Sequence, residues 1–309
     1  MEAVLNSTVP LVVLVAAGYL ARRFRLLKPG DERVLNAYVY WFALPALFVF
    51  ELTHTVLTPT VLRFMGVGLA PVLGVAGAEA VVLRLARVPR TVRYLVVLST
   101  VFGSLAFFGI PFVEFSLGGE EPVRLASLAT AGMGPVTVGL VLFLLEAHRV
   151  QRAHWGDRAK AVGRRLVRNP LILSIFLGIL LSGVGWNLPG PVAKALRLLG
   201  STTAPVALFT LGVFFYGRPY RNLLQGLALS LPRLLLLPAV TYLAANWAGL
   251  SSLEAAVLVL LNGTPLAVNT VVLSQRYRFH EEALATAMLV SSLGAMVTLN
   301  LWRWVLGLG

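Results

Sequence analysis

Apolar runs of roughly 20 residues recur along the whole chain, and each is long enough to cross a membrane as a helix. The runs are continuously apolar, so helices are favoured over the alternating strands of a membrane barrel. With 58% of its residues hydrophobic and 13% charged, the chain cannot cover its apolar surface in water. The sequence therefore predicts an all-α polytopic membrane protein with ten transmembrane helices. We place them at 3–21, 32–52, 61–83, 92–117, 122–147, 169–186, 192–216, 223–246, 253–278 and 282–305.

The basic residues gather in alternate loops between these runs. If the N-terminus lies outside, most of the 26 lysine and arginine residues fall on the cytoplasmic side, as the positive-inside rule requires. The first run is preceded by Glu2 and followed by Arg22 and Arg23, the reverse of a signal peptide. Topology and an anionic cytoplasmic leaflet thus explain the net charge of +13 without nucleic acid. We expect a multi-pass protein of the bacterial inner membrane with both termini outside.

Five runs precede the polar segment 148–168 and five follow it. An odd number of spans in each half puts the halves in opposite orientations, which is typical of inverted-repeat transporters. Residues 43–48 and 204–209 are similar, and the fourth run of each half contains a glycine two residues before a proline. We predict a first five-helix repeat over 1–147, a cytoplasmic connector over 148–168 and a second, inverted repeat over 169–309.

Prolines inside the fourth and ninth runs predict breaks in these helices. Pro111 follows Gly109, and Pro265 follows Gly263. A proline removes one backbone donor and crowds the carbonyl four residues earlier, and an adjacent glycine allows the chain to unwind. Two breaks near the midplane would expose half-helix N-termini, which suit a carboxylate, and C-termini, which suit a cation. A plain kink remains the alternative for each proline.

Polar side chains near the two breaks complete the predicted substrate site. The Ser104 hydroxyl precedes the first break, and Asn262, Thr264 and Asn269 surround the second. A hydrogen bond of Ser104 to its own helix and helix–helix contacts of the other three are the structural alternatives. The predicted substrate-binding residues are Ser104, Gly109, Pro111, Asn262, Gly263, Thr264, Pro265 and Asn269.

Three further residues are candidates for coupling or charge balance. Glu79 lies in the third run, Arg233 in the eighth and Gln275 near the cytoplasmic end of the ninth. Ionisable residues inside a membrane are functional candidates by default. The alternatives are an ion pair with a nearby arginine for Glu79, snorkelling for Arg233 and an interfacial place for Gln275. A proton or a sodium ion would be the coupling ion.

The sequence contains no cysteine, and its four histidines fall in loops or at the ends of runs. No histidine–carboxylate cluster, nucleophile elbow or phosphate-binding loop is evident, so metal-dependent and nucleophilic enzymes lack their parts. We expect no enzyme activity, no metal and no cofactor beyond the coupling ion.

Five short motifs, in this order along the chain, resemble the auxin efflux carrier family of membrane transporters. They are Leu44–Phe48, Phe108–Pro111, Arg168–Ile172, Pro205–Gly212 and Thr264–Asn269. The resemblance implies a fold similar to that of bile acid:sodium symporters. Spans 1, 2, 6 and 7 would form a scaffold, and spans 3–5 and 8–10 a mobile core with helices 4 and 9 crossing at their prolines. It further implies elevator-type alternating access and a homodimer through the scaffold. Bacterial relatives carry small carboxylates such as malate or malonate, and plant members carry auxin. The family commonly has asparagine where this chain has Ser104.

The predicted function is a secondary active transporter or uniporter of a small organic anion, with its site at the crossing of helices 4 and 9. One alternative is a sodium-coupled symporter on the same fold, for which Asn262, Asn269 and Gln275 would supply cation ligands. An alternative from another class is a membrane-embedded enzyme or sensor, which would need a convergent catalytic set or a soluble output domain.

Overall fold

The computed structural model describes residues 2–53, 58–149, 160, 163–164, 167–186, 188–217 and 220–308. Within these ranges the chain is helical and has no strand, so the predicted all-α fold is confirmed there. The first half forms α1 (Glu2–Arg23), α2 (Asp31–Tyr38), α3 (Leu44–Thr53), α4 (Pro59–Leu85), α5 (Arg90–Val101), α6 (Ile110–Leu117) and α7 (Glu120–Arg149). The second half forms α9 (Pro170–Gly183), α10 (Gly190–Ser201), α11 (Thr203–Phe215), α12 (Leu223–Leu231), α13 (Leu237–Trp247), α14 (Ser252–Asn262), α15 (Asn269–Tyr277) and α16 (Glu281–Val305). Most of the predicted connector 148–168 lies outside the described residues.

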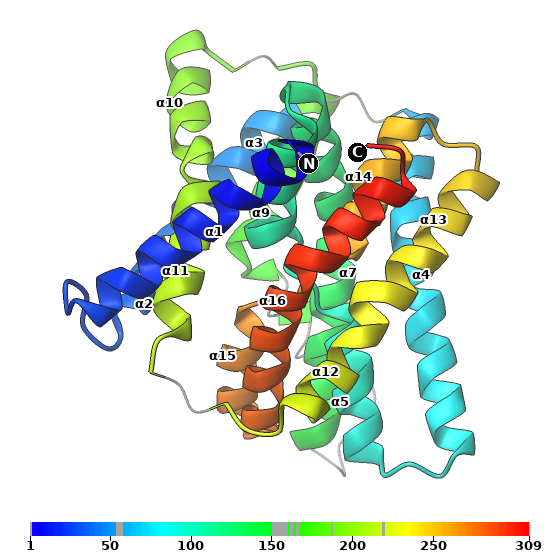
Figure 1. The fold of residues 1–309 in the computed structure, drawn as a ribbon. Coiled ribbons are helices and arrows are strands. Elements are labelled where there is room, and N and C mark those ends of the chain that lie inside the picture. The colour runs from blue at the N-terminus through cyan, green and yellow to red at the C-terminus, as the bar shows by residue number, and fades with distance from the viewer. Residues whose placement is uncertain are drawn as a thin grey trace.

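Six helices or continuous helical runs of the described chain are long and apolar enough to span a membrane. They are Asp31–Thr53, Pro59–Leu85, Glu120–His148, Gly190–Phe215, Leu223–Trp247 and Glu281–Val305. Shorter apolar helices cover Leu105–Leu117, Pro170–Gly183 and Ser252–Asn262. These segments make the chain a multi-pass membrane protein, and their ends agree with the expected spans to within a few residues. The N-terminal end of α1 and the C-terminal end of α16 lie at the same end of the bundle (Figure 1).

Three short π-helical segments interrupt the helices, and each is followed by a proline at the second position of the next helix. The segments are η1 (Val39–Ala43), η2 (Leu105–Gly109) and η3 (Pro232–Leu236), and the prolines are Pro45, Pro111 and Pro238. A proline has no N–H to donate and its ring crowds the preceding turn. A wider π turn relieves that crowding, so these prolines are accommodated without ending the apolar segment.

The helices pack in pairs that match between the two halves. Helix α1 of the first half packs against α11 of the second, and α9 of the second half packs against α3 of the first. Within the first half α4 packs against α5, and within the second half α13 packs against α14. Helix α7 likewise contacts α4, and α16 contacts α12. Gly18 of α1 and Gly212 of α11 face the other helix's backbone so closely that a Cβ on either would collide with a carbonyl group. Small residues at that position are therefore required for the close approach of α1 and α11.

Candidate functional site

Two apolar segments, 90–117 and 252–277, are each interrupted, and their interruptions pair with one another. Helix α5 ends at Val101 and η2 begins at Leu105, while α14 ends at Asn262 and α15 begins at Asn269. Between them, the Ser104 N–H donates to the Pro265 carbonyl at 2.8 Å, and the Ala267 N–H donates to the Phe102 carbonyl at 2.9 Å. Gly103 and Leu266 form the antiparallel bridge enclosed by these two bonds. Unwound backbone inside a membrane needs such partners, because no water or helix supplies them.

Pro265 takes part in this contact, but Pro111 does not. The prediction that both segments meet at prolines is therefore wrong for Pro111, which lies at the second position of α6. The Gly109 N–H donates to the Ser104 carbonyl at 2.9 Å, which is the wide turn of η2 that precedes this proline. The fourth segment instead unwinds at Gly103, where the absence of a side chain leaves room for the guanidinium of Arg233.

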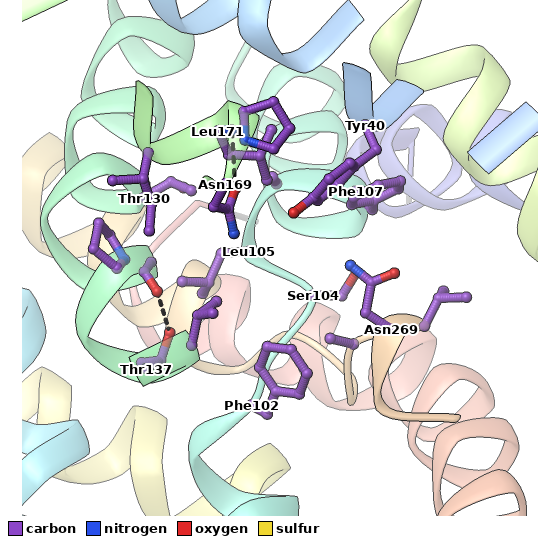
Figure 2. Close-up of a pocket in the computed structure, with 18 of the residues that line it drawn as sticks. Tyr40, Phe102, Ser104, Leu105, Phe107, Thr130, Thr137, Asn169, Leu171 and Asn269 are labelled. Atoms are coloured by element: carbon purple, nitrogen blue, oxygen red, sulfur yellow. Dashed lines mark hydrogen bonds between the residues drawn. The ribbon is translucent and has the colours of Figure 1, made fainter. Parts of the chain in front are cut away.

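We call the contact between residues 102–104 and 265–267 the crossing. A cavity of about 810 Å³ lies beside it (Figure 2). Ser104 and Asn269 line it, from the two interrupted segments, and Thr130 and Thr137 line it from α7. Its apolar lining combines aliphatic side chains with five aromatic ones: Tyr40, Trp41, Phe48, Phe102 and Phe107. The cavity thus combines a few polar groups near the crossing with an extensive apolar wall, as is usual for small-molecule sites.

Helix N-terminal ends converge on this cavity. The first residues of η2, from Leu105 to Phe107, and the first residue of α15, Asn269, belong to its lining. Asn169 lines it as well and caps α9, since its side-chain oxygen accepts from the Leu171 N–H at 3.0 Å. The N-terminal end of a helix carries partial positive charge and N–H groups that are not used within the helix. These ends therefore give the cavity a potential that favours an anion.

Arginine side chains add to this positive potential. Arg33, Arg164 and Arg168 line the cavity, and none of its described lining residues is acidic. All three belong to the sequence regions that the positive-inside pattern assigns to the cytoplasmic side. A cavity lined by one sign of charge concentrates ligands of the opposite sign.

Of the eight predicted substrate-binding residues, Ser104 and Asn269 line the cavity and the other six do not. Asn262 is fully buried, and its amide donates to the Gly68 carbonyl at 3.1 Å and to the Thr241 hydroxyl at 2.9 Å. Its described role is thus to join α14 to α4 and α13, the helix–helix alternative. Thr264 is also fully buried, and its hydroxyl donates to the Leu261 carbonyl at 2.6 Å.

The glycines of the predicted site also serve packing. A Cβ on Gly109 would press on the side chains of Leu261 and Thr264, and a Cβ on Gly263 would press on Leu299. Both positions therefore need a small residue for the close approach of neighbouring segments, and neither belongs to the cavity lining.

Two of the coupling candidates, Glu79 and Arg233, do not belong to the cavity lining. Arg233 is 1% exposed and donates to backbone carbonyls of both interrupted segments. One carboxylate oxygen of Glu79 accepts from the Thr100 hydroxyl at 2.7 Å, and the other is buried with no partner among the described residues. The side chain of Gln275 lies outside the described part of the structure.

Sequence reasoning did not identify most of the residues that line the cavity. Arg33 was assigned to topology alone, and Arg168 to topology and a family motif. Tyr40 and Thr137 sit in apolar runs that give no sign of facing a cavity. Asn169 carried a usable signal, because an asparagine directly before a proline is typical of a helix N-terminus.

Comparisons with known proteins find similarity to membrane transporters. A family model described as membrane transport protein matches residues 3–303. An uncharacterized transporter of Methanocaldococcus jannaschii is 23% identical over 96% of both chains. A Rhizobium meliloti protein, named as a proposed malonate transporter, is 26% identical over 97% of this chain and 95% of its own. Auxin efflux carrier component 1 of Arabidopsis thaliana is 29% identical over 48% of this chain and 25% of its own.

Proposed function

The chain belongs to the membrane transport protein family, the auxin efflux carrier family that its motifs predicted, and we propose that it is a secondary transporter of a small organic anion. One observation carries the choice of an anion. Helix N-terminal ends and three arginines line a single cavity at the crossing, and no described lining residue opposes them with a negative charge. The relative named as a proposed malonate transporter supports a carboxylate as the transported group.

We place the substrate carboxylate between Ser104 and Asn269. Both side chains line the cavity at the start of a half-helix, and Figure 2 draws them on the same part of its wall. A carboxylate there would accept from the Ser104 hydroxyl and the Asn269 amide, and the two helix ends would stabilise its charge. The aromatic wall would contact the rest of the anion and exclude water.

The proposal includes ten spans arranged as two inverted five-helix repeats, with interrupted helices 4 and 9. The paired contacts support it. If spans 1–5 are exchanged with spans 6–10, the contact between α1 and α11 corresponds to the contact between α9 and α3. In the same way, the contact between α4 and α5 corresponds to the contact between α13 and α14. The shared end of the two termini also fits an even number of crossings (Figure 1). We propose that both termini lie outside the bacterial inner membrane.

We propose elevator-type movement, and the position of the cavity supports it. Part of its lining comes from α2, η1, α3 and α9, which belong to the proposed scaffold of spans 1, 2, 6 and 7. Most of the rest comes from the crossing and α7, which belong to the proposed mobile core of spans 3–5 and 8–10. A site at the boundary of two groups can be exposed to either side when one group moves against the other. We further propose a homodimer through the scaffold.

We propose a proton, carried by Glu79, as the coupling ion. The carboxylate of Glu79 binds Thr100, whose own carbonyl accepts from Arg233 at the crossing. Protonation of Glu79 would therefore change its hydrogen bond with Thr100, the residue that Arg233 connects to the crossing. An intramembrane carboxylate with an unpartnered oxygen is suited to this role.

Uptake into proteoliposomes tests the proposal. Purified protein should give saturable uptake of at least one labelled organic anion from a panel of malonate, a longer dicarboxylate and an aromatic monocarboxylate. Protein-free liposomes and the Asn269→Ala variant are the controls. Transport of a neutral solute without transport of any organic anion would contradict the proposal.

A further inference from the structure

Arg233 is the largest fully buried side chain, and its guanidinium lies at the crossing. Its Nε donates to the Thr264 carbonyl at 2.9 Å, its Nη1 to the Thr100 carbonyl at 3.1 Å and its Nη2 to the Leu261 carbonyl at 3.1 Å. Nη2 also donates to the Thr264 hydroxyl at 2.8 Å. One side chain from η3 thus joins the C-terminal ends of α5 and α14.

The bonded carbonyls include two that the interruptions leave without their helical donor. The donor four residues after Leu261 would be Pro265, which has no N–H. The donor four residues after Thr100 is Ser104, whose N–H is directed to Pro265 instead. Arg233 therefore takes the place of the missing helical donor at the Thr100 carbonyl, and it adds a donor to the Leu261 carbonyl, which also accepts from the Thr264 N–H and hydroxyl.

The two helix ends also balance the charge of Arg233. No carboxylate pairs with it in the part of the chain that the structure describes. Each helix C-terminus carries about half a negative charge, so two ends together offset about one positive charge. Gly103 makes this arrangement possible, because a Cβ there would overlap the guanidinium.

Half-helix C-termini are the place where transporters with broken helices coordinate a coupling cation, through unwound carbonyl oxygens. Here those oxygens already accept from a fixed cation. We propose that Arg233 is a resident cation that replaces a coupling metal ion at the crossing, so that the protein is stable and transports its substrate without sodium. This inference goes beyond the proposed anion site and argues against the sodium-coupled symporter.

The first test uses the unaltered protein. Its melting temperature should be the same in sodium chloride and in choline chloride of equal ionic strength. In proteoliposomes, the initial rate of anion uptake should stay within twofold when choline replaces sodium. A saturable stabilisation by sodium, or uptake that requires sodium, would overturn the proposal. The melting measurement does not depend on the proposed function, so a failure of either can be recognised separately.

The second test removes the resident cation. Arg233→Ala removes the donors to the Thr100 and Thr264 carbonyls and one of the donors to the Leu261 carbonyl, and it opens space, so its melting temperature should fall by about 10 °C. Millimolar guanidinium or sodium should partly restore the melting temperature, since a small cation can enter the opened space. Arg233→Met is the matched control, because it removes the charge but fills the space, and it should gain nothing from either ion. Arg233→Lys keeps a cation and should remain independent of sodium.

Equal rescue of the alanine and methionine variants, or no rescue of either, would show that Arg233 serves packing alone and would overturn the proposal. If Arg233→Ala does not fold, the comparison of sodium with choline on the unaltered protein still decides it.

Discussion

The Ser104 N–H donates to the Pro265 carbonyl at 2.8 Å, although the two residues belong to opposite halves of the chain. This bond and its companion between Ala267 and Phe102 hold two interrupted apolar segments against each other. On one side of the contact Ser104 and Asn269 line the cavity, and on the other side Arg233 joins the helix C-termini. The proposed anion site and the proposed site of the resident cation therefore share one short stretch of backbone.

Asn269→Ala and Ser104→Ala should each weaken substrate binding. Loss of one hydrogen bond to a carboxylate costs about 1.4 kcal/mol, which raises the half-saturation concentration about tenfold. Uptake kinetics in proteoliposomes measure this. Thr137→Val is the control, because Thr137 lines the same cavity but its hydroxyl donates to the Gly134 carbonyl at 3.0 Å. An equal effect of all three substitutions would argue against a specific carboxylate site.

Removal of positive charge from the cavity should slow anion entry. Arg33→Gln and Arg168→Gln should each raise the half-saturation concentration several-fold at low salt, and the difference should shrink at high salt because ions screen the attraction. Arg87→Gln is the control, since Arg87 is exposed and lies outside the cavity lining. Salt-independent loss of uptake in the two cavity variants would point to misfolding instead.

Glu79→Gln should uncouple transport from the proton gradient. The glutamine amide can keep the hydrogen bond with the Thr100 hydroxyl but cannot release or take up a proton at transport pH. We expect downhill anion uptake to persist, whereas acceleration by an imposed pH gradient should disappear. A Glu79→Gln variant that responds to the pH gradient like the unaltered protein would exclude Glu79 as the proton carrier.

Asn262 should contribute to stability and leave substrate affinity unchanged. Asn262→Ala removes the amide bonds to Gly68 and Thr241 and leaves buried partners unsatisfied, at a cost of about 1–3 kcal/mol in unfolding free energy. A double-mutant cycle with Thr241→Val should show coupling, because the two side chains share a hydrogen bond. The exposed Asn246, substituted by alanine, is the control. An unchanged melting temperature together with a raised half-saturation concentration would place Asn262 in the substrate site.

Hydrophobic length and charge made most of the fold predictable. Apolar runs determine where helices span a membrane, and each expected range found a helix or an interrupted helical segment. Pro265 and Asn269 were also informative, because a proline two residues after a glycine, with asparagines nearby, disfavours a continuous helix in an apolar run. Pro111 misled the prediction, since a proline after a π turn at the start of a helix needs no break.

The rest of the site depends on contacts that sequence distance conceals. The sequence made Arg233 a candidate for charge balance or snorkelling, and its contacts at the crossing emerge only where Thr100, Leu261 and Thr264 come together. Gly103 was one of many glycines, and only the guanidinium beside it explains the need for glycine. The arginines of the cavity carry the same signature as any cytoplasmic loop, so charge alone did not single them out.

Thiol labelling tests most directly whether the substrate binds at the crossing. The chain contains no cysteine, so only an introduced cysteine can react. Ser104→Cys should react with a negatively charged methanethiosulfonate in membranes, and the transported anion should slow that reaction at concentrations that saturate transport. Ser230→Cys, at a buried position bonded to Gly226 and Ala287, should stay unlabelled. If a saturating organic anion leaves the labelling rate at Ser104→Cys unchanged, the substrate does not bind at the crossing.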